Sequence, residues 1–185
     1  MSRELSRTLL SGKENAELQR KVIALLGAFC LFLSAVEYLI PKPLPFMRIG
    51  IANLPIMLAL DILPFCGFLL LIAIKILGQA IITGTLFSYV FLFSLAGTYT
   101  SALSMYGIRR LMGSKHISFI GVGTLGALVS NASQLVIAWF FLFGENVRFI
   151  APPFLAVGIV TGGLLGLFCE AFTGRSKWYE QRRIR

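Results

Sequence analysis

The stretch from residue 41 to residue 64, PKPLPFMRIGIANLPIMLALDILP, constrains the fold of this chain more than any other. It lies between two strongly apolar segments, yet it contains five prolines, Arg48, Asn53 and Asp61. The prolines at 41, 43 and 45 end the preceding helix, because proline lacks an amide donor and disfavours helix in the residue before it. A simple membrane-spanning helix would not tolerate this mixture.

The apolar run that follows Arg48 is also too short for a simple span. It covers residues 49–63 and is interrupted by Asn53-Leu54-Pro55. A helix of that length rises about 22 Å, whereas the hydrocarbon core is roughly 30 Å thick. Irregular backbone at membrane depth is tolerated only where protein or a water-filled cavity surrounds it. We therefore interpret this element as a broken helix that forms the floor or wall of a binding site.

The composition predicts an integral membrane protein with one domain. Hydrophobic residues make up 57% of the 185 residues, and polar tracts occur only at the two ends. We expect a cytoplasmic lead over residues 1–20, a transmembrane domain over 21–172 and a basic cytoplasmic tail over 173–185. The net charge of +9 does not indicate nucleic-acid binding, because the basic residues gather in the tails and one loop without interleaved aromatics.

The apolar segments predict an all-α polytopic bundle of about six transmembrane helices. The expected spans are residues 21–40, the short element 49–63, and then 65–82, 87–108, 117–143 and 154–172. Most basic residues fall on one side of this arrangement, and the positive-inside rule places both termini in the cytoplasm. The expected location is the cell membrane of a prokaryote, as a multi-pass protein.

Lys75 is the most informative single residue. It lies near the middle of the third expected span, where a charge costs roughly 3 kcal/mol on insertion scales. Gln79 follows one turn later on the same helix face. We predict that the Lys75 ammonium contacts a carboxylate or phosphate of a ligand, and the alternatives are a structural pair with Glu37 or snorkelling to the interface.

Four further polar residues are candidates for the same binding site. Arg48 could face the cavity or lie at the outer headgroup level. The Asn53 side chain could hydrogen-bond to free backbone groups of the broken helix as well as to a ligand. Asn131 and Gln134 share one face of the fifth span, where either ligand contact or interhelical hydrogen bonding would explain them. The predicted substrate-binding set is Arg48, Asn53, Lys75, Gln79, Asn131 and Gln134.

Small residues mark two expected helix contacts. The first span carries Ala24 and Ala28 four residues apart, and the last carries Gly158, Gly162 and Gly166. Such spacing lets helix backbones approach closely. The sequence alone does not say whether these surfaces pack within the chain or against a partner.

The sequence contains no pattern that predicts an enzyme, a metal site or a cofactor. Asp61 is the only aspartate, so an aspartate-rich magnesium clamp for diphosphates cannot form. The single histidine lies in a basic loop, the three cysteines are far apart, and no GxxxxGK[ST] phosphate-binding loop occurs. We expect neither catalysis nor ATP hydrolysis by this chain.

Several motifs together resemble the Gx transporter family, also labelled heptaprenyl diphosphate synthase component I. They are residues 37–41, RIGIANL at 48–54, Lys75, TGTLFS at 83–88, SLAG at 94–97 and NASQ at 131–134. The family is similar to the substrate-binding S components of energy-coupling factor (ECF) vitamin transporters, which are six-helix membrane proteins. That resemblance implies an outward-facing substrate site, docking of Ala24 and Ala28 on a transmembrane coupling subunit, and a partner pair of ATPases.

The resulting expectation is a membrane transport subunit that captures a small anionic solute from outside for ATPase-driven uptake. One alternative is a membrane accessory subunit of isoprenoid or quinone biosynthesis, which the family label suggests. Another is a structural subunit of a membrane redox complex. The resemblance does not carry over a substrate, because S components with this fold bind unrelated vitamins and metal ions.

Overall fold

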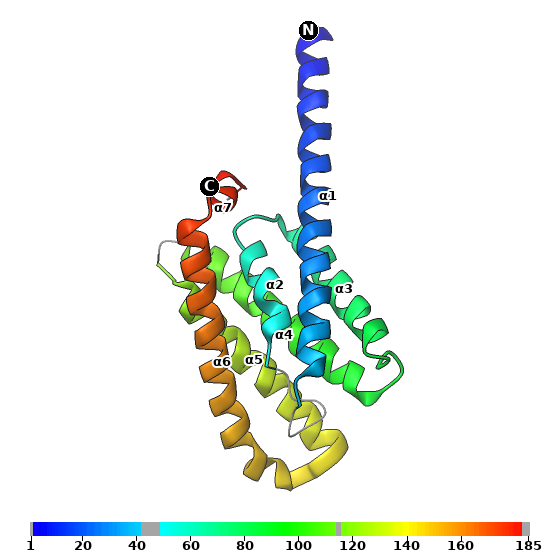
Figure 1. Ribbon diagram of the computed structural model, residues 1–185, viewed down its shortest axis with the longest axis vertical. Helices are drawn as coiled ribbons and strands as arrows, with labels where there is room; N and C mark the ends of the chain where they lie inside the picture. The colour runs from blue at the N-terminus through cyan, green and yellow to red at the C-terminus, as the bar shows by residue number, and fades with distance from the viewer. Residues whose placement is uncertain (1, 42–48, 114–115, 183–185) are drawn as a thin grey trace.

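The protein is a bundle of helices, described here from a computed structural model (Figure 1). The structure describes residues 2–41, 49–113 and 116–182, with side chains from residue 15 onward. The described part contains helices and turns but no strand. The elements are α1 (Ser2–Leu39), η1 (Ile51–Asn53), α2 (Leu54–Ala59), α3 (Phe65–Ile82), α4 (Tyr89–Met112), α5 (Phe119–Ala138), η2 (Trp139–Phe143), η3 (Gly144–Asn146), α6 (Val147–Arg175) and α7 (Lys177–Arg182).

The bundle has the apolar helices of a membrane protein. Three helical segments are long and apolar enough to cross a bilayer, namely Asn15–Leu39, Phe65–Ile82 and Phe119–Arg175, the last of which contains α5 and α6. The expected all-α membrane bundle is therefore confirmed, while six crossings remain a prediction. Both chain ends lie toward the same end of the molecule, and α1 projects beyond the bundle there (Figure 1). Their location in the cytoplasm also remains a prediction.

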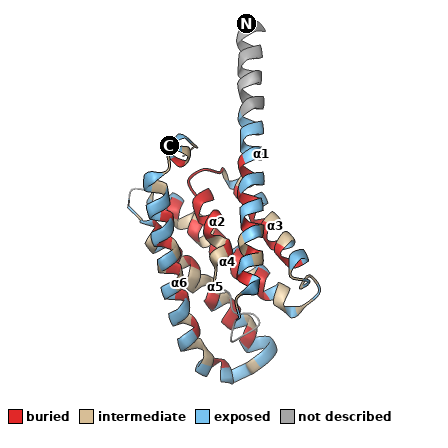
Figure 2. Ribbon diagram, viewed as in Figure 1, coloured by how far each residue is buried: buried red, intermediate tan, exposed pale blue. Residues whose placement is uncertain are grey.

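The element after residue 48 is short and surrounded by protein. Gly50 has a φ of 88°, a left-handed conformation that glycine adopts without strain, and the chain then enters η1 and α2. Every residue from 54 to 63 is buried, so α2 forms the centre of the bundle (Figure 2). Its broken backbone is therefore enclosed by other helices, as irregular backbone at membrane depth requires.

The helices group into two units, each made of helices that pack extensively on one another. In the N-terminal unit, α1 packs on η1, α2 and α3, whereas in the C-terminal unit α5 packs extensively on both α4 and α6. Contacts between the units, chiefly of α3 with α4 and of α2 with α6, are less extensive. The sequence left open whether the glycine stripe of the last span packs within the chain or against a partner. The structure buries its glycines against α5, namely Gly158, Gly162 and Gly166.

The bounds of α6 differ from those of the last expected span. The last long helix begins at Val147 and contains Pro152 and Pro153, although these prolines were expected to precede it. Proline removes a hydrogen bond to the carbonyl four residues earlier, and here the two carbonyls belong to Arg148 and Phe149, which are exposed residues in the first turn of the helix. At the other end, α6 continues to Arg175 and is followed by α7, within the segment expected to be a tail.

Candidate functional site

Polar residues from both helical units enclose one small cavity within the bundle. Its volume is about 30 Å³. The N-terminal unit contributes Glu37, Asn53, Lys75 and Gln79, and the C-terminal unit contributes Thr98, Ser101, Ser130, Asn131 and Thr161. The structure thus brings together four of the six predicted site residues, which are 53, 75, 79 and 131.

Lys75 lies at the boundary between the units. Its side chain is 1% exposed, and Nζ donates a hydrogen bond of 2.8 Å to Thr98 Oγ1 on α4. The ammonium therefore lies inside the bundle and does not snorkel to an interface. A buried charge of this kind is costly in a membrane protein unless polar groups or water solvate it.

Glu37 anchors the broken element to the end of α1. Its carboxylate accepts hydrogen bonds from the backbone N–H groups of Ile49, Gly50 and Ala52 at 2.9, 3.2 and 3.1 Å. These bonds satisfy amide groups at the start of η1 and stabilise the carboxylate charge at its place in the cavity wall. Glu37 consequently helps to position Asn53, which follows directly in η1.

Two amide oxygens in the cavity wall have no hydrogen-bond partner among the described residues. They are Gln79 Oε1 on α3 and Asn53 Oδ1 at the end of η1. Gln79 is 6% exposed, so bulk water does not reach its side chain freely. Because an unpaired buried polar atom is costly, these oxygens favour a bound N–H or O–H donor in the cavity.

The other predicted site residues differ in where they lie relative to the cavity. Asn131 lines the cavity, but its Nδ2 donates to the Phe154 carbonyl at 2.8 Å, which joins α5 to α6. Gln134 does not line the cavity, and its Nε2 donates to the backbone and the hydroxyl of Ser130. Arg48 lies outside the described residues.

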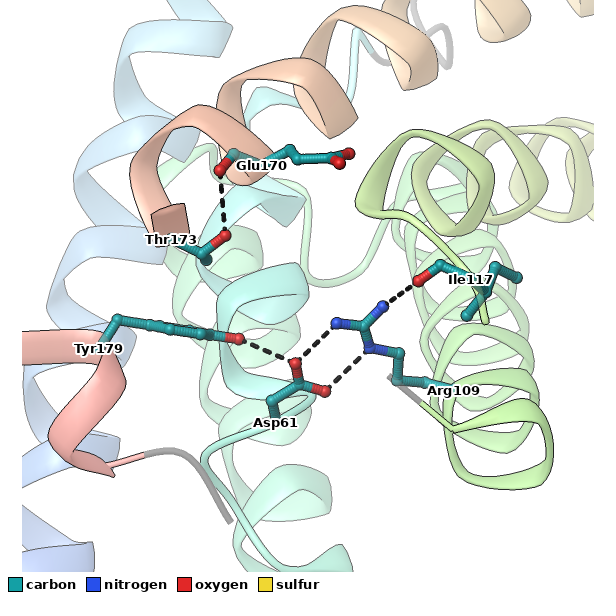
Figure 3. Close-up of polar contacts among 6 residues, drawn as sticks. All are labelled: Asp61, Arg109, Ile117, Glu170, Thr173 and Tyr179. Atoms are coloured by element: carbon teal, nitrogen blue, oxygen red, sulfur yellow. Dashed lines mark hydrogen bonds and ion pairs between the residues drawn. The ribbon is translucent and has the colours of Figure 1, made fainter. Parts of the chain in front are cut away.

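A second buried polar cluster, which the sequence interpretation missed, lies at the end of the bundle that holds the chain termini. Arg109 Nε and Nη2 donate to the two Asp61 carboxylate oxygens at 2.9 and 2.7 Å (Figure 3). Tyr179 on α7 donates its hydroxyl to Asp61 at 3.2 Å, and the remaining Arg109 nitrogen donates to the Ile117 carbonyl. The sequence contained one signal of this cluster, namely Asp61 standing alone between apolar residues. A buried carboxylate of this kind requires a polar or charged partner.

This cluster borders a larger cavity of about 590 Å³. Glu170, Arg175, Lys177 and Glu180 contribute further charges to its wall. The charged groups named here comprise equal numbers of acidic and basic side chains, so the cavity shows no preference for one sign of charge. Among the described residues, no group of three or more His, Cys, Asp or Glu side chains could hold a metal ion.

The predicted docking residues Ala24 and Ala28 lie on the outer surface of α1. Both are exposed, together with Phe32 farther along the helix, whereas Leu26 and Cys30 on the other face are buried. The intervening Gly27 instead packs toward Ile74 of α3. The two alanines are thus accessible to lipid or to a partner helix.

The fold and the enclosed polar site define a helical membrane protein with a polar cavity between two packed units. The chain belongs to the heptaprenyl diphosphate synthase component I family, whose family model matches residues 26–172. This is the family that the sequence motifs resemble. Comparisons with curated proteins and with solved structures found no match.

Proposed function

We propose that this protein is the substrate-binding subunit of a prokaryotic membrane transporter, similar to an ECF S component. In this proposal it spans the cell membrane several times and binds a small anionic solute in the cavity beside Lys75. The observation that carries the proposal is a polar cavity inside an apolar bundle, lined by a buried ammonium and two unpaired amide oxygens. Such convergent polar groups in an enclosed site are typical of small-molecule recognition.

The groups in the cavity wall define the chemistry of the proposed solute. The Lys75 ammonium would attract a carboxylate or phosphate, and hydrogen bonds to charged groups are among the stronger ones. Gln79 and Asn53 would accept N–H or O–H groups of the same solute. The Glu37 carboxylate is held in place by three backbone amides, so its position does not depend on the solute.

The volume of the cavity limits what this arrangement can hold. About 30 Å³ accommodates roughly one or two water molecules. An organic solute would therefore bind only after the lining residues move apart. We assign the present geometry to a closed arrangement of the site.

The proposed transport requires partners. The sequence contains no P-loop, so energy from ATP would come from a partner pair of ATPases. A transmembrane coupling subunit would connect them to this chain, and the exposed Ala24 and Ala28 offer a surface for close helix contact.

Native mass spectrometry of the purified protein tests the proposal. We expect wild-type protein to retain a small molecule, and Gln79→Leu protein to lose it, because the substitution removes one acceptor from the cavity. Thr100→Val provides a matched control, since Thr100 is exposed on α4 and absent from the cavity wall. Equal retention by the wild type and Gln79→Leu, or retention by neither, would contradict the proposal.

The family description supports a second candidate, an accessory subunit of prenyl diphosphate synthesis. Affinity purification from native membranes distinguishes the two. Stable recovery of ATPase subunits would support transport, whereas stable recovery of a prenyl synthase would support the second candidate.

A further inference from the structure

The cavity lies between two helical units whose internal packing is tighter than their mutual packing. Within the C-terminal unit, α5 and α6 cross at glycines with backbone against backbone, so this pair cannot separate without losing close contacts. The contacts of α3 with α4 and of α2 with α6 are less extensive. Movement that widens the cavity is therefore expected between the units and not within them.

The strongest polar interaction between the units is at the end of the bundle that holds the chain termini. Asp61 belongs to the N-terminal unit and Arg109 to the C-terminal unit, and their bidentate ion pair is buried at 5% and 6% side-chain exposure. Tyr179, which follows α6, adds a hydroxyl donor to Asp61. Separating such a buried pair is costly, because each charge would be left uncompensated.

Aromatic contacts reinforce the same end. Across the units, the Phe68 ring on α3 lies 4.9 Å from the Tyr106 ring on α4. Within the C-terminal unit, the Arg109 guanidinium lies 4.3 Å from the Phe119 ring centroid, which holds Arg109 in place at this end. We define Asp61, Arg109, Tyr179 and these aromatic residues as the terminal-end clasp. The unpaired oxygens of Gln79 and Asn53 lie instead near the C-terminal end of α3 and at the N-terminal end of α2.

We infer that the two helical units pivot about the terminal-end clasp, so that the Lys75 cavity opens at the opposite end of the bundle. A pivot of this kind widens the cavity while the buried Asp61–Arg109 pair stays intact, and rigid-body rotation about an interface is a common form of such change. The inference rests on the proposed function only in that a solute uses the opening. The movement itself can be measured without a solute.

Distances between spin labels, measured by electron double resonance in lipid nanodiscs, test the pivot. Exposed positions allow a cavity-end pair at Leu39 and Phe149, a terminal-end pair at Leu18 and Leu111, and a pair within the C-terminal unit at Tyr89 and Phe149. The exposed Cys66 is replaced by Ser, while Cys30 and Cys169 are buried. We expect a broader distance distribution for the cavity-end pair than for the other two pairs.

A matched pair of isosteric substitutions shows whether the cavity controls this movement. Thr98→Val removes the acceptor that Lys75 uses across the units, whereas Thr100→Val removes a hydrogen bond to Ser133 within the C-terminal unit. We expect Thr98→Val to lengthen the mean cavity-end distance by more than about 2 Å, the scale of a domain rearrangement. Thr100→Val should leave all three pairs unchanged.

Tyr179→Phe tests the clasp separately, because it keeps the ring and removes the hydroxyl that donates to Asp61. It should broaden the terminal-end distribution. Equal widths for all three pairs in every variant would overturn the inference, as would a terminal-end pair that is broader than the cavity-end pair in unsubstituted protein. If the spin-label distances show the pivot but the protein binds no solute, the proposed function is refuted and the inferred pivot is not.

Discussion

A Cβ atom placed on Gly162 would lie 2.6 Å from the carbonyl oxygen of Gly123, because the backbones of α6 and α5 lie against each other there. It would also lie 2.7 Å from the Ala127 Cβ. Backbone atoms cannot give way as the end of a flexible side chain can. The neighbouring Gly163 faces away from this crossing, and its Cβ would meet only the Thr124 hydroxyl at 3.8 Å.

We therefore predict different effects of alanine on stability at these adjacent glycines. Gly162→Ala should lower the free energy of unfolding by about 1–3 kcal/mol, as overpacking of a close contact does. Gly163→Ala should be neutral or stabilise by up to about 1 kcal/mol, because alanine favours helix over glycine. Thermal unfolding of both variants in one detergent checks this, and equal melting temperatures would contradict the described α5–α6 crossing.

The sequence predicted most of the fold because hydrophobicity marks helices that are long and apolar. The expected span 65–82 coincides with α3, and the prolines after Ile40 coincide with the end of α1. The α6 boundary was less predictable, because Pro152 and Pro153 lie beyond the first turn of α6, where proline ordinarily ends or kinks a helix. The short helix α7 carries no strong apolar pattern, and its buried Tyr179 is stabilised by Asp61 from a distant part of the chain.

The candidate site was predictable where a polar residue stood out against an apolar background. Lys75 and Gln79 were found in this way, and the structure buries both beside one cavity. The partners of such residues come from distant segments, so spacing could not reveal them. Thr98 resembles any other hydroxyl residue in α4, although it accepts the Lys75 hydrogen bond. Arg109 is one of the basic residues that the positive-inside rule assigns to the cytoplasmic side, yet its guanidinium lies in a buried ion pair.

The Glu37 carboxylate should contribute more to stability than an exposed carboxylate does. Glu37→Gln removes the charge and replaces one acceptor oxygen by a donor NH2 group. Two backbone N–H groups bond one oxygen and the third bonds the other, so at least one N–H group loses its acceptor. We expect a loss of about 1.5–3 kcal/mol, the range for a hydrogen bond to a charged group. Thermal unfolding measures the loss.

Glu145→Gln is the control for this comparison, because Glu145 forms an exposed ion pair with Arg148. Exposed pairs of this kind contribute about 0–1 kcal/mol. A melting temperature for Glu37→Gln as high as that of Glu145→Gln would show that the amide contacts of Glu37 do not stabilise the fold.

The exposed alanines of α1 allow a test of partner docking. Ala24→Trp combined with Ala28→Trp should leave solute binding intact but abolish uptake and co-purification of a coupling subunit, because bulky side chains prevent close backbone approach. Val160→Trp combined with Leu164→Trp places the same bulk on exposed positions of α6 and should not affect uptake. Normal transport by a folded Ala24/Ala28 double variant would place the docking surface elsewhere.

Lys75→Met tests whether the buried ammonium binds the solute. Methionine keeps much of the side-chain length and removes the charge, while a leucine or methionine at mid-membrane depth carries no insertion penalty comparable to that of lysine. If the ammonium donates to an anionic group, its loss removes roughly 1.5–3 kcal/mol of binding free energy. That range corresponds to about 10- to 150-fold weaker binding of the solute identified by mass spectrometry.

The melting temperature separates this role from a structural role of Lys75 beside Glu37. If Lys75 mainly balances the Glu37 charge in the cavity wall, Lys75→Met should lower the melting temperature, and adding Glu37→Gln should partly restore it. Lys21→Met, at an exposed ion pair on α1, controls for loss of a positive charge from the chain. Affinity and melting temperature are therefore measured for Lys75→Met, Glu37→Gln and the double variant. Unchanged affinity in a folded Lys75→Met protein would remove Lys75 from the solute site, because no bond to an anion could then have been lost.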